Sequence, residues 1–291
     1  MSHGVQAERF MVLSQGICMS DLQTSFRNQR LLIKNLPTLP AAFQEARRIA
    51  DNPKATVAQL AEVIGRDQSL AGKVLKLVNS STYGFPGRIA SIQNALVLLG
   101  FNVIKSLIIS TVVFENMPAG MTELWHHSVG CSTACRELGR LLRMENVDEL
   151  AIAGLLHDIG KVVIAVQLPE AHKEICRLVR EADITCLAAE ERILGITHPY
   201  IGAWLAEHWH LPADLRSALA FHHQPASAND HMTIASGVHI GNFLTHLFEF
   251  GNGGDDNVPL LDPHAFKHLG LSHQNLSMLI DIVGEKFEQE G

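Results

Sequence analysis

Apolar residues recur three and four positions apart along most of the chain, whereas alternations of apolar and polar residues are few. The first spacing is typical of a helix with one buried face, and the second of a half-buried strand. Proline, glycine and asparagine interrupt the pattern at short intervals, which predicts short links between helices. In the first part of the chain we expect helices over 41–51, 57–65, 69–79, 91–99 and 103–115.

The same spacing predicts further helices over 121–143, 147–156, 169–182, 185–195, 211–221, 232–250 and 274–289, and one that begins at 197. Thr56, Asp67 and Thr185 each precede a helical pattern. Their side chains can accept a hydrogen bond from an N–H group of the first turn, so we expect them to be N-caps. Polar stretches predict a loop at 226–231 and an exposed loop at 251–257.

The most apolar long stretch, residues 95–114, has the length of a membrane span. Asn102, Lys105 and Ser106 interrupt it, and Gly100 breaks its helical pattern. A pair of buried helices broken at Gly100 explains the stretch better than a transmembrane helix, so we expect no membrane association.

Composition narrows the class of protein. The chain has 291 residues, of which 47% are hydrophobic and 6% aromatic, and this length is enough to bury a substantial core. A formal net charge of -7 and the lack of a Lys and Arg cluster argue against nucleic-acid binding. The five cysteines suit free thiols in a reducing compartment. No signal peptide pattern is present, and we therefore predict a cytoplasmic protein.

Residues 154–161 read Gly-Leu-Leu-His-Asp-Ile-Gly-Lys, and they end an apolar helical run with His157 next to Asp158. We expect Gly160 to terminate the helix, because glycine readily takes the left-handed conformation of a C-cap. An imidazole and a carboxylate at the end of a buried helix suit a divalent metal with mixed nitrogen and oxygen ligands. The dipeptide alone favours a structural hydrogen-bonded pair instead, because most isolated His-Asp pairs are of that kind.

The chain has sixteen histidines, so only their spacing can nominate further ligands. Taken singly, His198 suits a helix cap, and His222 and His223 suit favourable partners of a helix C-terminus. Asn242, taken alone, is consistent with an ordinary buried amide. One of the two adjacent histidines, His126 or His127, is consistent with a partly buried side chain.

Several separated motifs resemble one family. Residues 154–161 resemble the signature of the HD superfamily of metal-dependent phosphohydrolases, in which a histidine and the next aspartate bind metal. Leu-Pro-Thr-Leu-Pro at 36–40 and the stretches 64–84 and 92–100 resemble the N-terminal half of an HDOD domain. That family joins a helical bundle to an HD-like domain and occurs mainly in bacterial signalling proteins. The resemblance covers residues 30–245, and it implies an all-α protein with an N-terminal helical bundle packed on a C-terminal HD-type helical bundle.

The resemblance also implies a role for each matching residue. His127, His157 and Asp158 match the core metal ligands. Lys161 matches a lysine that touches a phosphate or a bridging carboxylate, so Asp158 and Lys161 are the implied catalytic residues. Asn242 stands where the family usually has its last aspartate ligand, and a neutral amide oxygen holds a hard divalent ion less tightly.

His198, His222 and His223 match the extra ligands of the HD-GYP branch, which holds two or more metals. The implied cofactors are therefore divalent ions, up to two, and mixed nitrogen and oxygen ligation suits Fe, Mn, Ni or Zn. The residues after His223 lack the Asp-Gly and Gly-Tyr-Pro elements expected of a cyclic-di-GMP phosphodiesterase, so we do not expect that specificity.

Two functions follow from the resemblance. The first is a bacterial signalling-type HDOD protein that binds divalent metal and hydrolyses a phosphate ester or nucleotide. The alternative is a non-catalytic HDOD module that binds a signalling protein partner and keeps a structural or vestigial metal site. We expect an N-terminal extension, an N-terminal HDOD subdomain, an HD-type metal-binding subdomain, and a loop with a C-terminal helix, at 1–30, 31–118, 119–250 and 251–291. The sequence indicates no oligomeric state.

Overall fold

The computed structural model describes residues 39–50, 52, 54–80, 88–255 and 257–290, which belong to one compact unit. Among these residues there is no strand, so the prediction of an all-α fold is confirmed. The expected N-terminal extension at 1–30 lies outside the described residues, and the boundaries at 118 and 250 stay predictions.

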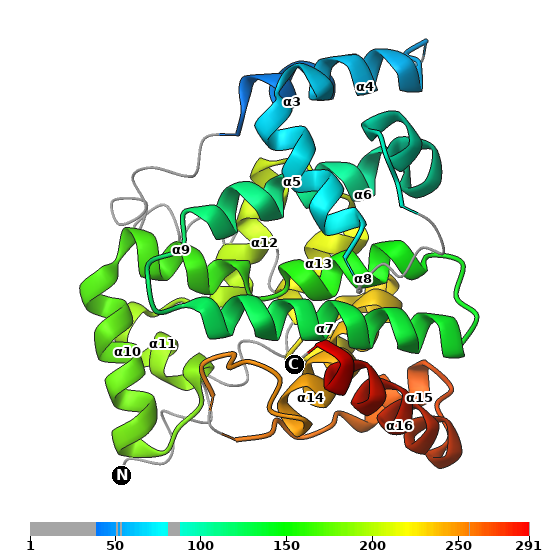
Figure 1. Cartoon of the computed structure of the whole chain (residues 1–291). Coiled ribbons are helices and arrows are strands. Elements are labelled where there is room, and N and C mark those ends of the chain that lie inside the picture. Colours follow the sequence, from blue (N-terminus) through cyan, green and yellow to red (C-terminus); the bar gives the residue numbers. More distant parts are fainter. Residues whose placement is uncertain (1–38, 51, 53, 81–87, 256, 291) are drawn as a thin grey trace. The chain divides into compact units, whose positions relative to one another are not determined.

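The helices follow one another with short links, as the sequence predicts (Figure 1). They are α3 (Ala41–Ala50), α4 (Val57–Arg66), α5 (Gln68–Val78), α6 (Ile92–Glu115), α7 (Thr122–Leu141), α8 (Val147–Leu156), α9 (Ile159–Gln167), α10 (Pro169–Ala182), α11 (Cys186–Leu194), α12 (His198–His208), α13 (Ala213–Phe221), the 3-10 helix η1 (Pro225–His231), α14 (Met232–Leu247), α15 (Pro263–His268) and α16 (His273–Glu290).

The predicted N-caps are confirmed. The side chain of Thr56 accepts a hydrogen bond from the backbone N of Gln59, that of Asp67 from Leu70, and that of Thr185 from Ala188. Other local predictions were incomplete. The stretch expected as a polar loop at 226–231 forms η1, and the short helices α9 and α15 were not predicted. Both are brief, so their apolar spacing covers too few turns to be distinctive.

Helix α6 joins the two parts of the fold. Gly100 has φ 75° and ψ 167°, which breaks the helix where the sequence predicts two helices. α6 packs against α4 and α5 on one side and against α8 and α9 on the other. Within its most apolar 18-residue window, 67% is buried in the protein. Protein packing therefore accounts for the apolar stretch, and the N-terminal helices pack on the C-terminal bundle as expected.

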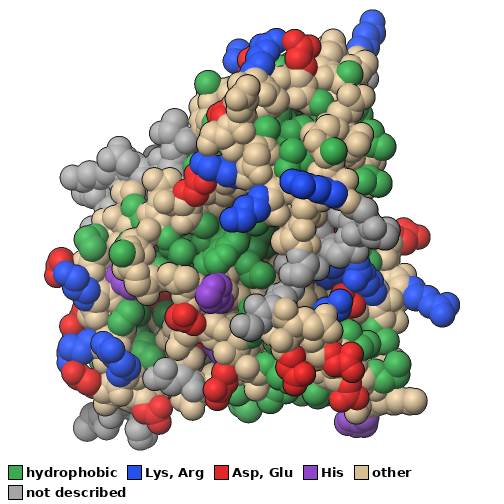
Figure 2. Space-filling view, viewed as in Figure 1, with side chains coloured by type: hydrophobic (Ala, Val, Ile, Leu, Met, Phe, Trp, Pro, Cys, Tyr) green, Lys and Arg blue, Asp and Glu red, His purple; other side chains and the backbone are tan. Residues whose placement is uncertain are grey.

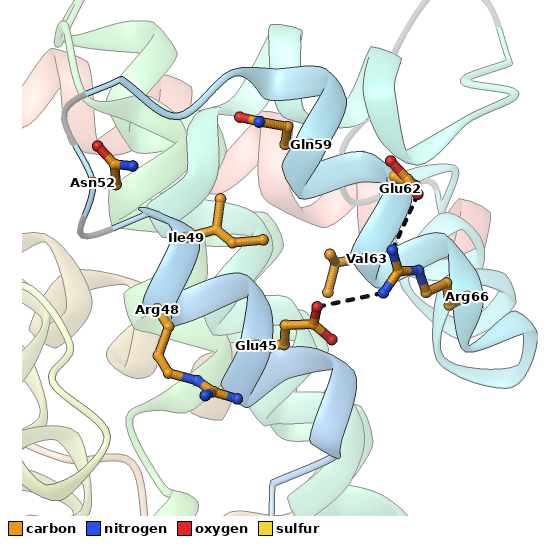
Figure 3. Close-up of a pocket in the computed structure, with 8 residues that line it drawn as sticks. All are labelled: Glu45, Arg48, Ile49, Asn52, Gln59, Glu62, Val63 and Arg66. Carbon is orange, nitrogen blue, oxygen red and sulfur yellow. Dashed lines mark hydrogen bonds and ion pairs between the residues drawn. The ribbon is translucent and has the colours of Figure 1, made fainter.

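Helices α3 and α4 enclose a surface cleft of about 520 Å³ (Figure 3). At its edge the guanidinium of Arg66 lies 3.4 Å from a carboxylate oxygen of Glu45 and 3.1 Å from one of Glu62. Exposed side chains of positive and of negative charge line this cleft. The buried clusters of histidine and carboxylate lie on other helices.

The core of the C-terminal bundle is built on α7, which packs against α8, α14 and α16. Cys131 and Cys135, one turn apart on α7, are fully buried. Their Sγ atoms lie 4.0 Å from the carbonyl oxygen of Val238 and 3.6 Å from that of Gly237, both on α14. These thiols fill the contact between two helices, as small buried residues do.

The prediction that Gly160 ends a helix was wrong. α8 ends at Leu156, His157 and Asp158 form the turn, and Gly160 lies in the first turn of α9. A Cβ atom at Gly160 would overlap the carbonyl oxygen of His198 at the start of α12. Glycine is therefore needed here for the close approach of two helices, and not for a left-handed backbone.

This contact makes a prediction about stability. Gly160→Ala should lower the free energy of unfolding by about 1–3 kcal/mol or more, because overpacking forces backbone shifts. Gly72→Ala is the control, because Gly72 lies within α5 with no heavy atom within 4 Å of the added Cβ. That change should be neutral or stabilising by up to about 1 kcal/mol. Urea denaturation measures both, and equal stability of the two variants would contradict the close approach.

Candidate metal centre

Asp158 lies at the centre of a buried cluster, with only 1% of its surface exposed. Two imidazoles face its Oδ1 atom: His198 Nε2 at 3.1 Å and His222 Nε2 at 3.7 Å. Two more face its Oδ2 atom: His157 Nε2 at 3.3 Å and His127 Nε2 at 3.8 Å. The carboxylate is thus surrounded by ring nitrogens on both sides.

The remaining predicted residues lie in the same cluster. The Lys161 Nζ atom is 2.8 Å from Asp158 Oδ2. His223 Nε2 is 3.1 Å from His198 Nε2, and the Asn242 side-chain oxygen is 2.9 Å from His127 Nε2. The structure therefore brings together every side chain that the sequence nominates. His126, the neighbour of His127, is exposed and lies apart from them.

Several helices supply these side chains, and most of them do so at an end. His157 and Asp158 lie in the turn between α8 and α9, His198 is the first residue of α12, and His222 and His223 follow α13. The polar residues at these ends interrupt the apolar pattern that keeps the helices buried. Their helices pack against one another, so the interruptions meet at one point in the interior.

Backbone contacts fix the protonation of two rings. His157 Nδ1 lies 2.7 Å from the carbonyl oxygen of Gly154, and His222 Nδ1 lies 3.1 Å from that of Leu219. A carbonyl oxygen only accepts, so each Nδ1 carries the hydrogen and each Nε2 carries a lone pair. Both Nε2 atoms and Asp158 Oδ1 are buried without a hydrogen-bond partner. Three buried acceptor atoms around Asp158 therefore lack a hydrogen-bond donor, which is costly unless a cation binds them.

Glu190 on α11 holds His198 in place, and the sequence analysis did not identify it. Its Oε2 atom accepts hydrogen bonds from His198 Nδ1 and from the His198 backbone N, each 2.7 Å long. A carboxylate that accepts from the far nitrogen of an imidazole is common behind metal-binding histidines. The available signal was its position on the buried face of α11, beside Cys186 and Ala189.

Burial and charge set the protonation of the cluster. Burial lowers the pKa of His127, His222 and His223 well below the usual value, so these rings are neutral. Burial acts to raise the pKa of Asp158, but charged neighbours, the Lys161 ammonium among them, outweigh it and hold this pKa well below its usual range.

The pKa values of two basic partners of Asp158, Lys161 and His198, are raised. Burial acts to lower the pKa of Lys161, and the Asp158 carboxylate outweighs it, so this pKa is raised. Burial also acts to lower the pKa of His198, but Glu190 and Asp158 raise it further than burial lowers it. Asp158 and Lys161 therefore form a buried pair of opposite charges.

Residues 251–255, which we call the strap, cover the Lys161 side of the cluster. The Gly253 carbonyl oxygen accepts a hydrogen bond of 2.6 Å from Lys161 Nζ, and Gly253 itself is buried against the His127 ring. The backbone N of Asn252 donates to the Glu123 carbonyl, and the Asp255 side chain accepts from the backbone N of Cys186. The prediction of an exposed loop at 251–257 agrees with the exposed Asn252, Gly254 and Asn257, but it is wrong for the buried Gly253.

His246 also borders the cluster, and the sequence analysis did not propose it as part of the site. It follows Asn242 by four residues on α14, so the two share a face. Its ring centroid lies 4.7 Å from that of His127, and burial lowers its pKa to about 4. The helical spacing from Asn242 was the signal that could have identified it.

Comparisons with known proteins agree with this architecture. The HDOD domain model matches residues 36–225. An HDOD domain protein of unknown function from Geobacter sulfurreducens has a similar structure, with a TM-score of 0.71, 24% identity, and coverage of 92% of this chain and 94% of that chain. A candidate signal transduction protein from Marinobacter aquaeolei VT8 has a TM-score of 0.67 and 25% identity, over 88% of this chain and 59% of that one. A candidate phosphohydrolase from Shewanella amazonensis SB2B has a TM-score of 0.61 and 23% identity, over 87% and 96%.

A comparison of sequences adds one relative. An uncharacterized protein of Treponema pallidum (strain Nichols) is 26% identical over 232 residues, which cover 78% of this chain and 45% of the relative. The chain therefore spans less than half the length of that protein. The domain match extends over most of the present chain and includes the His157–Asp158 turn, and on that basis the chain belongs to the HDOD domain family.

Proposed function

We propose that this HDOD protein binds a divalent metal ion beside Asp158 and hydrolyses a phosphate ester, with nucleotides as one class of substrate. The observation that carries the proposal is that three buried acceptors around Asp158 have no hydrogen-bond donor: Asp158 Oδ1, His222 Nε2 at 3.7 Å from it, and His157 Nε2 at 3.3 Å from Oδ2. A single water has two hydrogens and cannot satisfy all three. A divalent cation beside Asp158 accepts such lone pairs, and imidazole with carboxylate suits Fe, Mn, Ni or Zn.

The residues of the chain prepare the centre for such an ion. His127, His157, Asp158, His198, His222, His223 and Asn242 are the candidate ligands. The Gly154 and Leu219 carbonyls and the Glu190 carboxylate orient three of the rings. A bound divalent ion supplies Lewis acidity and lowers the pKa of a coordinated water.

Lys161 gives the centre a contact for the substrate. Its ammonium has three hydrogens, of which Asp158 and the Gly253 carbonyl accept two. The third is available to a phosphate oxygen, and a buried positive charge stabilises negative charge that develops there. This role of Lys161 favours a small anionic substrate such as a phosphate ester.

The face shown in Figure 2 favours a substrate other than a nucleic acid. On the face shown in Figure 2, the Lys and Arg side chains are interspersed with Asp and Glu. A nucleic-acid surface needs clustered positive charge. Placement in a bacterial cytoplasm stays a prediction from the sequence.

A second candidate function is a non-catalytic module that binds a signalling protein, with the metal in a structural role. Two observations favour it. The strap covers Lys161, and a candidate signal transduction protein shares 25% identity with this chain. His157→Ala and Asp158→Ala separate the two functions: they should abolish metal binding and hydrolysis under the first, and leave partner binding intact under the second.

The metal itself is tested by elemental analysis. Purified protein loaded with Zn²⁺, Mn²⁺, Fe²⁺ or Ni²⁺ should retain metal after desalting, and Asp158→Ala should retain none, because the central ligand is lost. Asp214→Ala is the control, since Asp214 pairs with His231 in a partly exposed ion pair outside the centre. If wild-type protein holds no metal after loading, the hydrolase proposal is wrong. Hydrolysis of bis-p-nitrophenyl phosphate then tests turnover.

The charge pair gives a further prediction. In metal-free protein, Lys161→Met should lower the free energy of unfolding by about 3–5 kcal/mol, because it leaves the Asp158 charge buried and unpaired. Lys173→Met removes a pair with the same spacing and the same 2.8 Å distance, to Glu170, but those side chains are 70% and 83% exposed. Its effect should stay below about 1 kcal/mol.

The pH dependence of that prediction has a definite sign. Asp158 has a lowered pKa in the folded protein, so its stabilising effect is present above the ordinary aspartate pKa of about 4 and is lost as the pH falls further. The stability difference between Lys161→Met and wild type should therefore shrink at low pH. A constant difference in urea denaturation from pH 7 to pH 3 would show that the pair is not responsible.

A further inference from the structure

The two oxygens of Asp158 face different surroundings. On the Oδ1 side lie His198, His222 and, beside His198, His223. On the Oδ2 side lie Lys161, His157 and the His127 ring, and Asn242 contacts His127. Each side has at least three potential ligand atoms within 4.8 Å of one another, which is enough to hold an ion. On the first side they belong to Asp158, His198, His222 and His223, and on the second to His127, His157 and Asp158.

The ligand atoms on the Oδ1 side already have the spacing of one coordination sphere. A tetrahedral ion with ligands at about 2.0–2.1 Å places those ligands about 3.3 Å from one another. Asp158 Oδ1 lies 3.1 Å from His198 Nε2 and 3.7 Å from His222 Nε2, and the two ring nitrogens of His198 and His223 are 3.1 Å apart. Asp158 Oδ1 and His222 Nε2 have no other partner.

On the Oδ2 side, Asp158 Oδ2 and His127 Nε2 already have partners, and only His157 Nε2 has none. The Lys161 ammonium contacts Oδ2 at 2.8 Å and the Gly253 carbonyl oxygen at 2.6 Å, so a positive charge lies where a second ion would bind. A divalent ion beside an ammonium would be repelled, and here it would gain no second carboxylate, because Asn242 is neutral.

The contact between His127 and Asn242 removes a further ligand from that side. The two side chains form a hydrogen bond of 2.9 Å through His127 Nε2. If the amide oxygen accepts, Nε2 carries a hydrogen; if the amide is turned, its nitrogen donates to the Nε2 lone pair. In either orientation the Nε2 lone pair of His127 is not directed at an ion.

We infer that the centre holds a single divalent ion, bound on the Oδ1 side by Asp158, His198, His222 and His223, and that the Lys161 ammonium takes the place of a second ion on the Oδ2 side. This inference rests on the proposed metal site and specifies its occupancy. His127 and Asn242 are then a neutral hydrogen-bonded pair that packs against the centre.

Zn²⁺ titration of the full chain tests the inference, with a chromophoric chelator as competitor and elemental analysis for stoichiometry. Wild type should bind one equivalent. His127→Ala should also bind one, with a dissociation constant within about threefold of wild type. His223→Ala removes a ligand, and its dissociation constant should rise at least tenfold. Thermal unfolding of the metal-free variants checks that each is folded.

If His127→Ala does not fold, His127→Gln replaces it, because an amide can keep the hydrogen bond to Asn242. Two equivalents in wild type, loss of Zn²⁺ from the folded His127 variant, or wild-type affinity in His223→Ala would each overturn the inference. No Zn²⁺ in wild type would instead refute the metal site as a whole. The absorption spectrum of the Co²⁺-loaded protein gives a second measurement, since its intensity should indicate four-coordination in wild type and in the His127 variant alike.

Discussion

A carboxylate in the protein interior is the constraint on which the centre depends. Asp158 is 1% exposed, and removing such a charge from water is favourable only where other charges and dipoles replace the solvent. The chain supplies them from both sides, with the Lys161 ammonium at one oxygen and ring nitrogens around both. The helices can meet at this point because their polar ends share this one group. The packing of the C-terminal bundle and the chemistry of its centre are thus aspects of a single arrangement.

The sequence predicts the helices well because their apolar spacing extends over several turns. Thr56, Asp67 and Thr185 are N-caps as expected, since capping depends on residues that are adjacent in the chain. The short helix α9 and the role of Gly160 could not be predicted in this way. Both follow from the approach of α9 to the start of α12, which brings together residues that lie 38 positions apart.

The residues of the candidate site also fall into those that the sequence predicts and those that only tertiary packing reveals. The seven predicted ligands and Lys161 come together in the structure, because a motif fixes the type and order of its residues. Glu190 and the strap were not identified, since their contacts with His198 and Lys161 depend on tertiary packing. The strap lies beyond the residues that match the HDOD domain, and Phe250, which precedes it, stacks on Phe287 of α16 at 4.2 Å. The C-terminal segment therefore completes a centre that the domain alone leaves open at Lys161.

Gly160 is required by the packing of two helices and not by the chemistry of the site. The overlap that excludes a side chain there involves the backbone of His198, so it would exist whatever side chain occupied position 198. A descendant of this chain could exchange every ring and carboxylate of the centre and still require glycine at this crossing. Among divergent sequences, this glycine would mark the shared architecture, while the histidines and Asp158 would distinguish those members whose side chains could hold an ion.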